Sequence, residues 1–128
     1  MHHVFETPKA PLPIGPYAQA LSAGNLIFIS GQIPLRPENG DLAGPDLITQ
    51  TRQVLKNLQA ILDAAGCTIS QIVKTTVYMT DLAEFASFNK IYAEWLGTHT
   101  PARSTVQVAA LPKGAQIEID AIVIKENI

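Results

Sequence analysis

Residues 116–124 read Gln-Ile-Glu-Ile-Asp-Ala-Ile-Val-Ile, and this stretch decides the fold. It is predicted to be a strand, whose successive side chains point to opposite faces of a sheet. One face then carries Ile117, Ile119, Ala121 and Val123, and the other carries Ile122 and Ile124 with Glu118 and Asp120. Because both faces are largely apolar, the strand is typical of a sheet that is covered on both sides.

The rest of the chain supplies the neighbours of this strand. Four more strands are predicted, at 17–23, 26–31, 72–80 and 102–108, and a tight Gly24-Asn25 turn joins the first two. With two helices between them, the order is β-β-α-β-α-β-β, an α+β fold with a mixed sheet and both helices on one face. Two helices can cover only one face, so we expect another subunit to bury the second face.

The two helices are marked by apolar residues at spacings of three and four. The first is predicted over 46–65, with Gly66 ending it, and the second follows a capping-box pattern at 81–84 and stops near Gly97. On the second helix we interpret four aromatic residues as core rather than a ligand cage: Phe85, Phe88, Tyr92 and Trp95.

Composition limits the class of protein. The 128 residues fit a single domain, 1–128, and 47% are hydrophobic, enough for a core. The net charge is −2 and the basic residues are scattered, so a nucleic-acid partner is not expected. The lone cysteine, Cys67, excludes a disulfide within the chain, and three histidines without metal-ligand spacing predict no metal site. With no signal peptide or membrane segment in view, we expect a soluble cytoplasmic protein.

Two charged residues stand out in the predicted strands. Arg103 shares a strand face with Thr105 and Gln107, and Glu118 lies between two isoleucines. Charged side chains are rarely buried without a partner. Either Arg103 and Glu118 form an internal ion pair with no chemistry, or Arg103 binds a substrate carboxylate while Glu118 handles a water or a proton.

Several blocks of sequence resemble the RidA/YjgF family of reactive-intermediate deaminases. The resemblance runs along essentially the whole chain, in order and without large insertions. The blocks are Ile14-Gly15-Pro16-Tyr17, Ser30-Gly31-Gln32-Ile33-Pro34, the segment 72–78, Pro101-Ala102-Arg103-Ser104 with Val106, and Leu111 followed by Ile117-Glu118-Ile119.

This resemblance implies a chorismate-mutase-like fold and a homotrimer whose sheets pack around the three-fold axis, with clefts between subunits. It implies hydrolysis of 2-iminobutanoate, 2-iminopropanoate and their enamine tautomers to 2-oxo acids and ammonia, without cofactor or metal. This hydrolysis would protect pyridoxal-phosphate enzymes from the reactive enamines. Arg103 matches the carboxylate-binding arginine and Glu118 the glutamate that activates water. The substrate-binding positions match Tyr17, Ser30, Gly31, Asn89 and Thr105, the last standing where many relatives have cysteine.

Three other functions remain open at this point. Some members of the family are described as endoribonucleases or translation inhibitors, although the net acidity argues against RNA binding here. A non-catalytic sensor of keto acids could use the same anion site. A purely structural oligomer would have Arg103 paired internally and would bind no anion.

Overall fold

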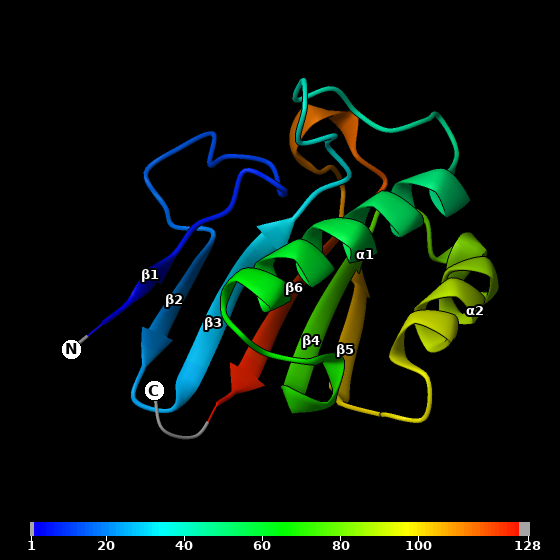
Figure 1. Cartoon of the computed structure of the whole chain (residues 1–128). Coiled ribbons are helices and arrows are strands. Elements are labelled where there is room, and N and C mark those ends of the chain that lie inside the picture. The colour runs from blue at the N-terminus through cyan, green and yellow to red at the C-terminus, as the bar shows by residue number, and fades with distance from the viewer. Residues whose placement is uncertain (1, 126–128) are drawn as a thin grey trace.

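The computed structural model describes residues 2–125 (Figure 1). Within this part of the chain, six strands form one sheet in the order β1-β2-β3-β6-β4-β5. Neighbouring strands run antiparallel, except that β4 and β5 are parallel, so the sheet is mixed. The strands are Val4–Phe5 (β1), Ala20–Ala23 (β2), Leu26–Gln32 (β3), Ile72–Met79 (β4), Ala102–Gln107 (β5) and Ile117–Ile124 (β6).

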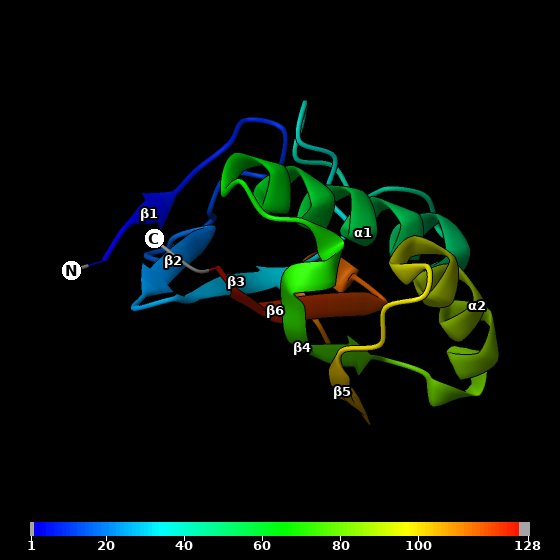
Figure 2. The same ribbon diagram turned by 60° about the horizontal axis from the view of Figure 1, so that its bottom comes forward.

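Two α-helices, α1 (Leu47–Ala64) and α2 (Phe85–Leu96), lie on the same face of the sheet, as predicted (Figures 1 and 2). Asp46 caps α1 by accepting a hydrogen bond from the Thr49 backbone N–H, at 3.0 Å. Gly66 follows the helix at φ +71°, a left-handed conformation that suits glycine at this position.

The core lies between the helices and the sheet, and β6 runs through its middle. The alternate residues Ile117, Ile119, Ala121 and Val123 are all buried there, which confirms the predicted face. Each fully buried isoleucine contributes roughly 1.5–3 kcal/mol relative to an exposed position. The position of β6 between β3 and β4, in the interior of the sheet, explains why six of its eight residues are apolar.

The opposite face of the sheet is open in this single subunit. Among residues 2–125, no helix covers it, as the turned view in Figure 2 shows. Large apolar side chains therefore remain in solvent, with Phe28 42% exposed and Val106 43% exposed. The sequence predicts that another subunit covers this face.

Three local features differ from the sequence-based expectation. Strand β1 adds one element before the predicted order, and its two residues are too few to show a period in the sequence. Residues 17–19 precede β2 instead of belonging to it. Asp81 caps a short 3-10 turn, Leu82–Glu84, that leads into α2, rather than α2 itself.

Neither helix of the described chain is long and apolar enough to cross a membrane. Cys67 is buried, as predicted for a small hydrophobic side chain.

Candidate functional site

Arg103 lies on β5, the edge strand, and points to the same side of the sheet as the helices. The parallel register places Arg103 beside Thr75 of β4, which is fully buried under α2. From there the arginine reaches α2, where its Nη1 donates a hydrogen bond to Oδ1 of Asn89, at 2.8 Å. Arg103 is nevertheless exposed, because no strand lies beyond β5 among the described residues.

Three aromatic rings of α2 surround the Arg103 guanidinium. Its Cζ lies 5.1 Å from the ring centre of Tyr92, 5.3 Å from that of Phe85 and 5.8 Å from that of Phe88. These distances are within the range of favourable cation–π contacts. We call Phe85, Phe88 and Tyr92 the aromatic shelf. These rings fix the guanidinium and leave most of its N–H donors free.

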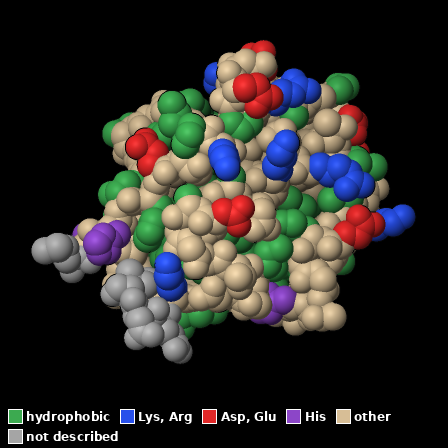
Figure 3. All heavy atoms as spheres, in the orientation of Figure 1, with side chains coloured by type: hydrophobic (Ala, Val, Ile, Leu, Met, Phe, Trp, Pro, Cys, Tyr) green, Lys and Arg blue, Asp and Glu red, His purple; other side chains and the backbone are tan. Residues whose placement is uncertain are grey.

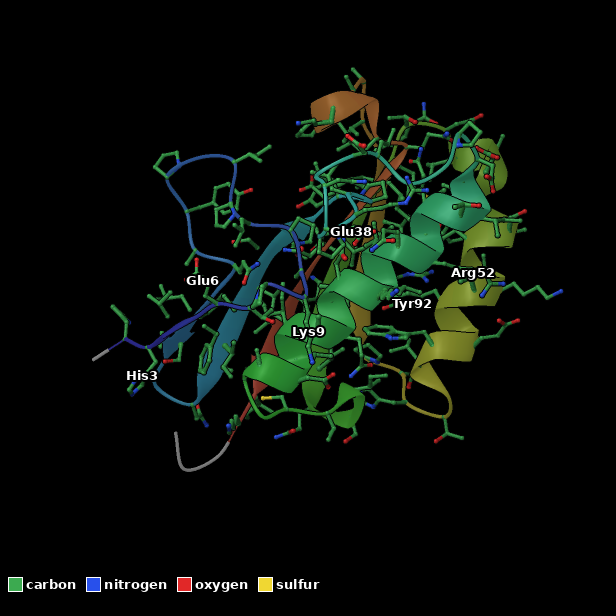
Figure 4. All side chains as sticks on the ribbon, turned by 45° about the horizontal axis from the view of Figure 1, so that its top comes forward. His3, Glu6, Lys9, Glu38, Arg52 and Tyr92 are labelled. Carbon is green, nitrogen blue, oxygen red and sulfur yellow. The ribbon has the colours of Figure 1, made fainter. Side chains whose placement is uncertain are left out.

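The shelf itself is anchored in the core. The Tyr92 hydroxyl is hydrogen-bonded to the Thr75 hydroxyl, at 2.6 Å, and both residues are buried. Burial raises the pKa of Tyr92, so the phenol stays neutral beside the arginine. In Figure 4, Tyr92 lies on the side of α2 that faces α1.

An open pocket of 480 Å³ lies beside this arginine, between the end of α2 and the start of β5. Its lining includes Arg103, Asn89, Tyr92 and His99. The pocket can admit a small molecule, and the guanidinium offers such a molecule a positive charge with planar paired donors.

Glu118 lies on the other face of the sheet. It alternates with Ile117 and Ile119, which are buried under the helices, so its side chain must point away from them. Burial raises the pKa of the Glu118 carboxyl above its usual range, and the nearby charge of Asp120 raises it further. A raised pKa makes the carboxylate a stronger base, better able to accept a proton from water.

A bulge in β3 brings Ser30 and Gly31 to Glu118. The pairing between β3 and β6 shifts between Ile29 and Gln32, so two residues of β3 face one of β6. Any side chain at Gly31 would overlap the Glu118 carboxylate. Ser30 is fixed by donating its hydroxyl hydrogen to the backbone oxygen of Ala18, at 2.5 Å.

Tyr17 stands at the rim of the same region. Together with Gly31 it lines a small cavity beneath the N-terminal loop. The ring is 47% exposed, and its hydroxyl accepts a hydrogen bond from the Ile14 backbone N–H, at 3.2 Å. The structure thus brings Tyr17, Ser30, Gly31 and Glu118 into one group.

The predicted site is therefore divided into two half-sites within one subunit. The arginine half-site holds Arg103 and Asn89 on the helix side, and the glutamate half-site holds Glu118 with its neighbours on the open side. Thr105 shares the face of Arg103, and its buried hydroxyl has no hydrogen-bond partner among the described residues. The alternative of an internal Arg103–Glu118 ion pair is wrong, because the two side chains lie on opposite faces of the sheet.

A larger groove of 820 Å³ crosses the outer surface between α1, α2 and the N-terminal loop, and none of the predicted site residues lines it. Figure 3 shows positive and negative side chains interspersed on this side of the molecule. The charges in the groove balance, since Lys9, Arg52 and Lys56 accompany Glu38, Asp63 and Glu94. Residues 2–125 contain no cluster of three or more histidine, cysteine, aspartate or glutamate side chains that could hold a metal ion.

Comparison with known proteins agrees with the resemblance seen in the sequence. The family model described as endoribonuclease L-PSP matches residues 7–125. The chain is a member of the RidA/YjgF family. Its relatives include a RutC family protein of Pyrococcus horikoshii, 51% identical over 98% of this chain and 100% of that protein. The human 2-iminobutanoate/2-iminopropanoate deaminase is 45% identical over 98% of this chain and 91% of that protein.

Solved structures of RidA-family proteins share the fold. Escherichia coli TdcF with bound serine superposes with a TM-score of 0.92 and is 42% identical, covering 97% of this chain and 99% of that one. The two helices on a mixed sheet are thus the architecture of the RidA/YjgF family.

Sequence reasoning missed the aromatic shelf. Phe85, Phe88 and Tyr92 were expected to be core, and they are, but they also hold the arginine. The sequence did contain a sign of this arrangement. Phe88, Asn89 and Tyr92 follow Phe85 by three, four and seven residues, which places all four on one face of the helix.

Proposed function

We propose that this RidA-family chain hydrolyses 2-imino acids, 2-iminobutanoate and 2-iminopropanoate together with their enamine tautomers, to 2-oxo acids and ammonia. The observation that carries the proposal is the state of Arg103, whose guanidinium is held by Asn89 and three rings beside an open pocket. A positive group fixed in this way is ready to bind the carboxylate of a small metabolite.

The chemistry requires one water and a relay of protons. Arg103 binds the carboxylate, and Asn89 occupies only one of its five N–H donors, so a paired contact remains available. Water adds to the imine carbon as Glu118 accepts its proton. The imine nitrogen takes that proton back from Glu118, which gives an amino alcohol. Glu118 then moves the proton of the new hydroxyl group to the amino group, the carbon–nitrogen bond breaks as the carbon–oxygen double bond forms, and a 2-oxo acid and ammonia leave.

The division into half-sites requires a second copy of the chain. We propose a homotrimer in which the open sheet faces pack together, so that the arginine half-site of one subunit meets the glutamate half-site of its neighbour. Tyr17, Ser30, Gly31 and Thr105 complete each cleft between subunits. The exposed Phe28 and Val106 support this assembly, because they would be buried in it.

The test is a coupled assay. Threonine dehydratase generates 2-iminobutanoate, and the release of 2-oxobutanoate above the spontaneous rate is followed for the wild type, for Arg103→Ala and for the control Arg52→Ala. Arg52 is an exposed arginine outside both half-sites. We expect Arg103→Ala to lose the rate enhancement and Arg52→Ala to keep it.

Three results would contradict the proposal. If Arg103→Ala matches the wild type, the arginine is not the carboxylate site. If the wild type binds 2-oxobutanoate without turning over the imine, the chain is a sensor. Cleavage of RNA by both variants, with no imine hydrolysis, would favour the endoribonuclease function instead.

A further inference from the structure

The N-terminal loop, residues 7–17, contributes Tyr17 to the glutamate half-site but contains no helix or strand. Four prolines within it remove backbone donors, so an ordinary hydrogen-bond ladder cannot hold it. Something else must fix its path over the sheet. Figure 1 shows the loop standing away from the sheet before the chain returns into β2.

The side chain of Gln19 holds this loop. Gln19 is 2% exposed, and its Oε1 accepts a hydrogen bond from the Thr7 backbone N–H, at 2.7 Å. The two hydrogens of its Nε2 are shared among the backbone oxygens of Pro11 at 2.8 Å, Thr7 at 3.1 Å and Ala10 at 3.3 Å. One amide therefore joins three separate points of the loop, and both of its ends are fully used.

The same residue is tied to the glutamate half-site through its backbone. The Gln19 carbonyl accepts a hydrogen bond from the Ser30 backbone N–H, at 2.9 Å, next to the bulge at Gly31. Gln19, Tyr17 and Gly31 also line the same small cavity. A change in the Gln19 side chain would thus act on the loop that carries Tyr17, two residues away.

We propose that Gln19 is a positioning residue, whose amide holds the loop 7–17 so that Tyr17 closes the substrate cleft. This inference rests on the proposed function. An amide is needed because the site presents one N–H donor and several carbonyl acceptors. Glutamate has nearly the same shape, but its ionised carboxylate cannot donate to the carbonyl oxygens and is destabilised beside them.

The expected kinetic effect follows from the population of the closed loop. When only a fraction of molecules holds the loop in place, the apparent affinity falls by that fraction while the bound complex reacts normally. We therefore expect Gln19→Ala and Gln19→Glu to raise KM about tenfold and to change kcat less than about threefold. A general loss of folded protein would lower the apparent kcat and leave KM unchanged.

Trypsin gives a second measurement that does not depend on the reaction. Lys9 lies in the loop next to Ala10, which is only 1% exposed, and Figure 4 shows Lys9 beside α1. Cleavage after Lys9 requires the loop to open, and mass spectrometry of the released peptide 1–9 reports its rate. We expect both Gln19 variants to be cut about tenfold faster than the wild type and than Gln71→Ala, a control glutamine whose side chain is hydrogen-bonded to Thr68 and Ile124, outside the loop.

Each outcome decides one point. Unchanged cleavage in both variants would show that the amide does not hold the loop. Faster cleavage with an unchanged KM would show that Gln19 holds the loop but does not position Tyr17. Loss of the oligomer in the Gln19 variants would show that the change in KM comes from the subunit interface. Either result would overturn the proposal. If the wild type itself fails to hydrolyse imines, the proposed function fails, whereas the proteolysis still tests the loop contact.

Discussion

Mixing two inactive variants tests whether the half-sites of neighbouring subunits form one cleft. Arg103→Ala removes the carboxylate contact and keeps Glu118, and Glu118→Gln does the reverse. Each charge-assisted hydrogen bond is worth roughly 1.5–3 kcal/mol, so loss of two lowers kcat/KM by about 10²–10⁴-fold. Alone, each variant should be almost inactive.

Mixed oligomers should recover activity by a defined amount. Arg103 and Glu118 point to opposite faces of the sheet, so a working cleft needs Arg103 from one subunit and Glu118 from the next. With equal, random mixing, each of these conditions is met half of the time. About one quarter of the clefts should then be intact, whatever the number of subunits in a closed ring.

The assay follows 2-oxobutanoate release after the two variants are unfolded, mixed and refolded together. A matched control mixes the double variant, Arg103→Ala with Glu118→Gln, with equal wild type. Clefts shared between subunits predict about one quarter of wild-type activity in this control too, whereas a site within one subunit predicts about one half. No recovery in the first mixture together with one half in the control would refute the two-subunit cleft.

Further predictions concern the glutamate half-site, the shelf and the open face. Gly31→Ala should displace the Glu118 carboxylate and lower kcat about 100-fold in the same assay, while wild-type kcat would show that the carboxylate is not needed there. Asp120→Asn should move the acid limb of the pH profile of kcat/KM to lower pH. The reason is that the Asp120 charge raises the pKa of Glu118, and the active base form of Glu118 appears only above that pKa. An acid limb that does not move would show that another group titrates there. Tyr92→Phe should lower the free energy of unfolding by about 1–2 kcal/mol in urea titration, since it breaks a buried hydrogen bond, yet retain kcat/KM because the ring remains. Phe28→Asp should reduce the mass measured by light scattering to about one third, and an unchanged mass would exclude this face as the interface.

Much of the fold could be predicted from the sequence because burial imposes a period on each element. The spacing of apolar residues predicted the helix α1, and the alternation of β6 named the four residues that the structure buries under the helices. Short or irregular pieces could not be predicted. The two residues of β1 have no period, and the bulge at Ser30 and Gly31 depends on how β3 pairs with β6.

The sequence by itself determined that Arg103 and Glu118 are exceptional, since Arg103 is a charge within a predicted strand and Glu118 is a charge between two isoleucines. It could not determine where they lie relative to each other. Alternation fixes faces only within one strand, whereas Arg103 and Glu118 lie on β5 and β6, and the registers through β4 place them on opposite faces. The tertiary structure alone therefore decided that Arg103 and Glu118 lie apart within one subunit, because strand pairing depends on contacts between segments far apart in the chain.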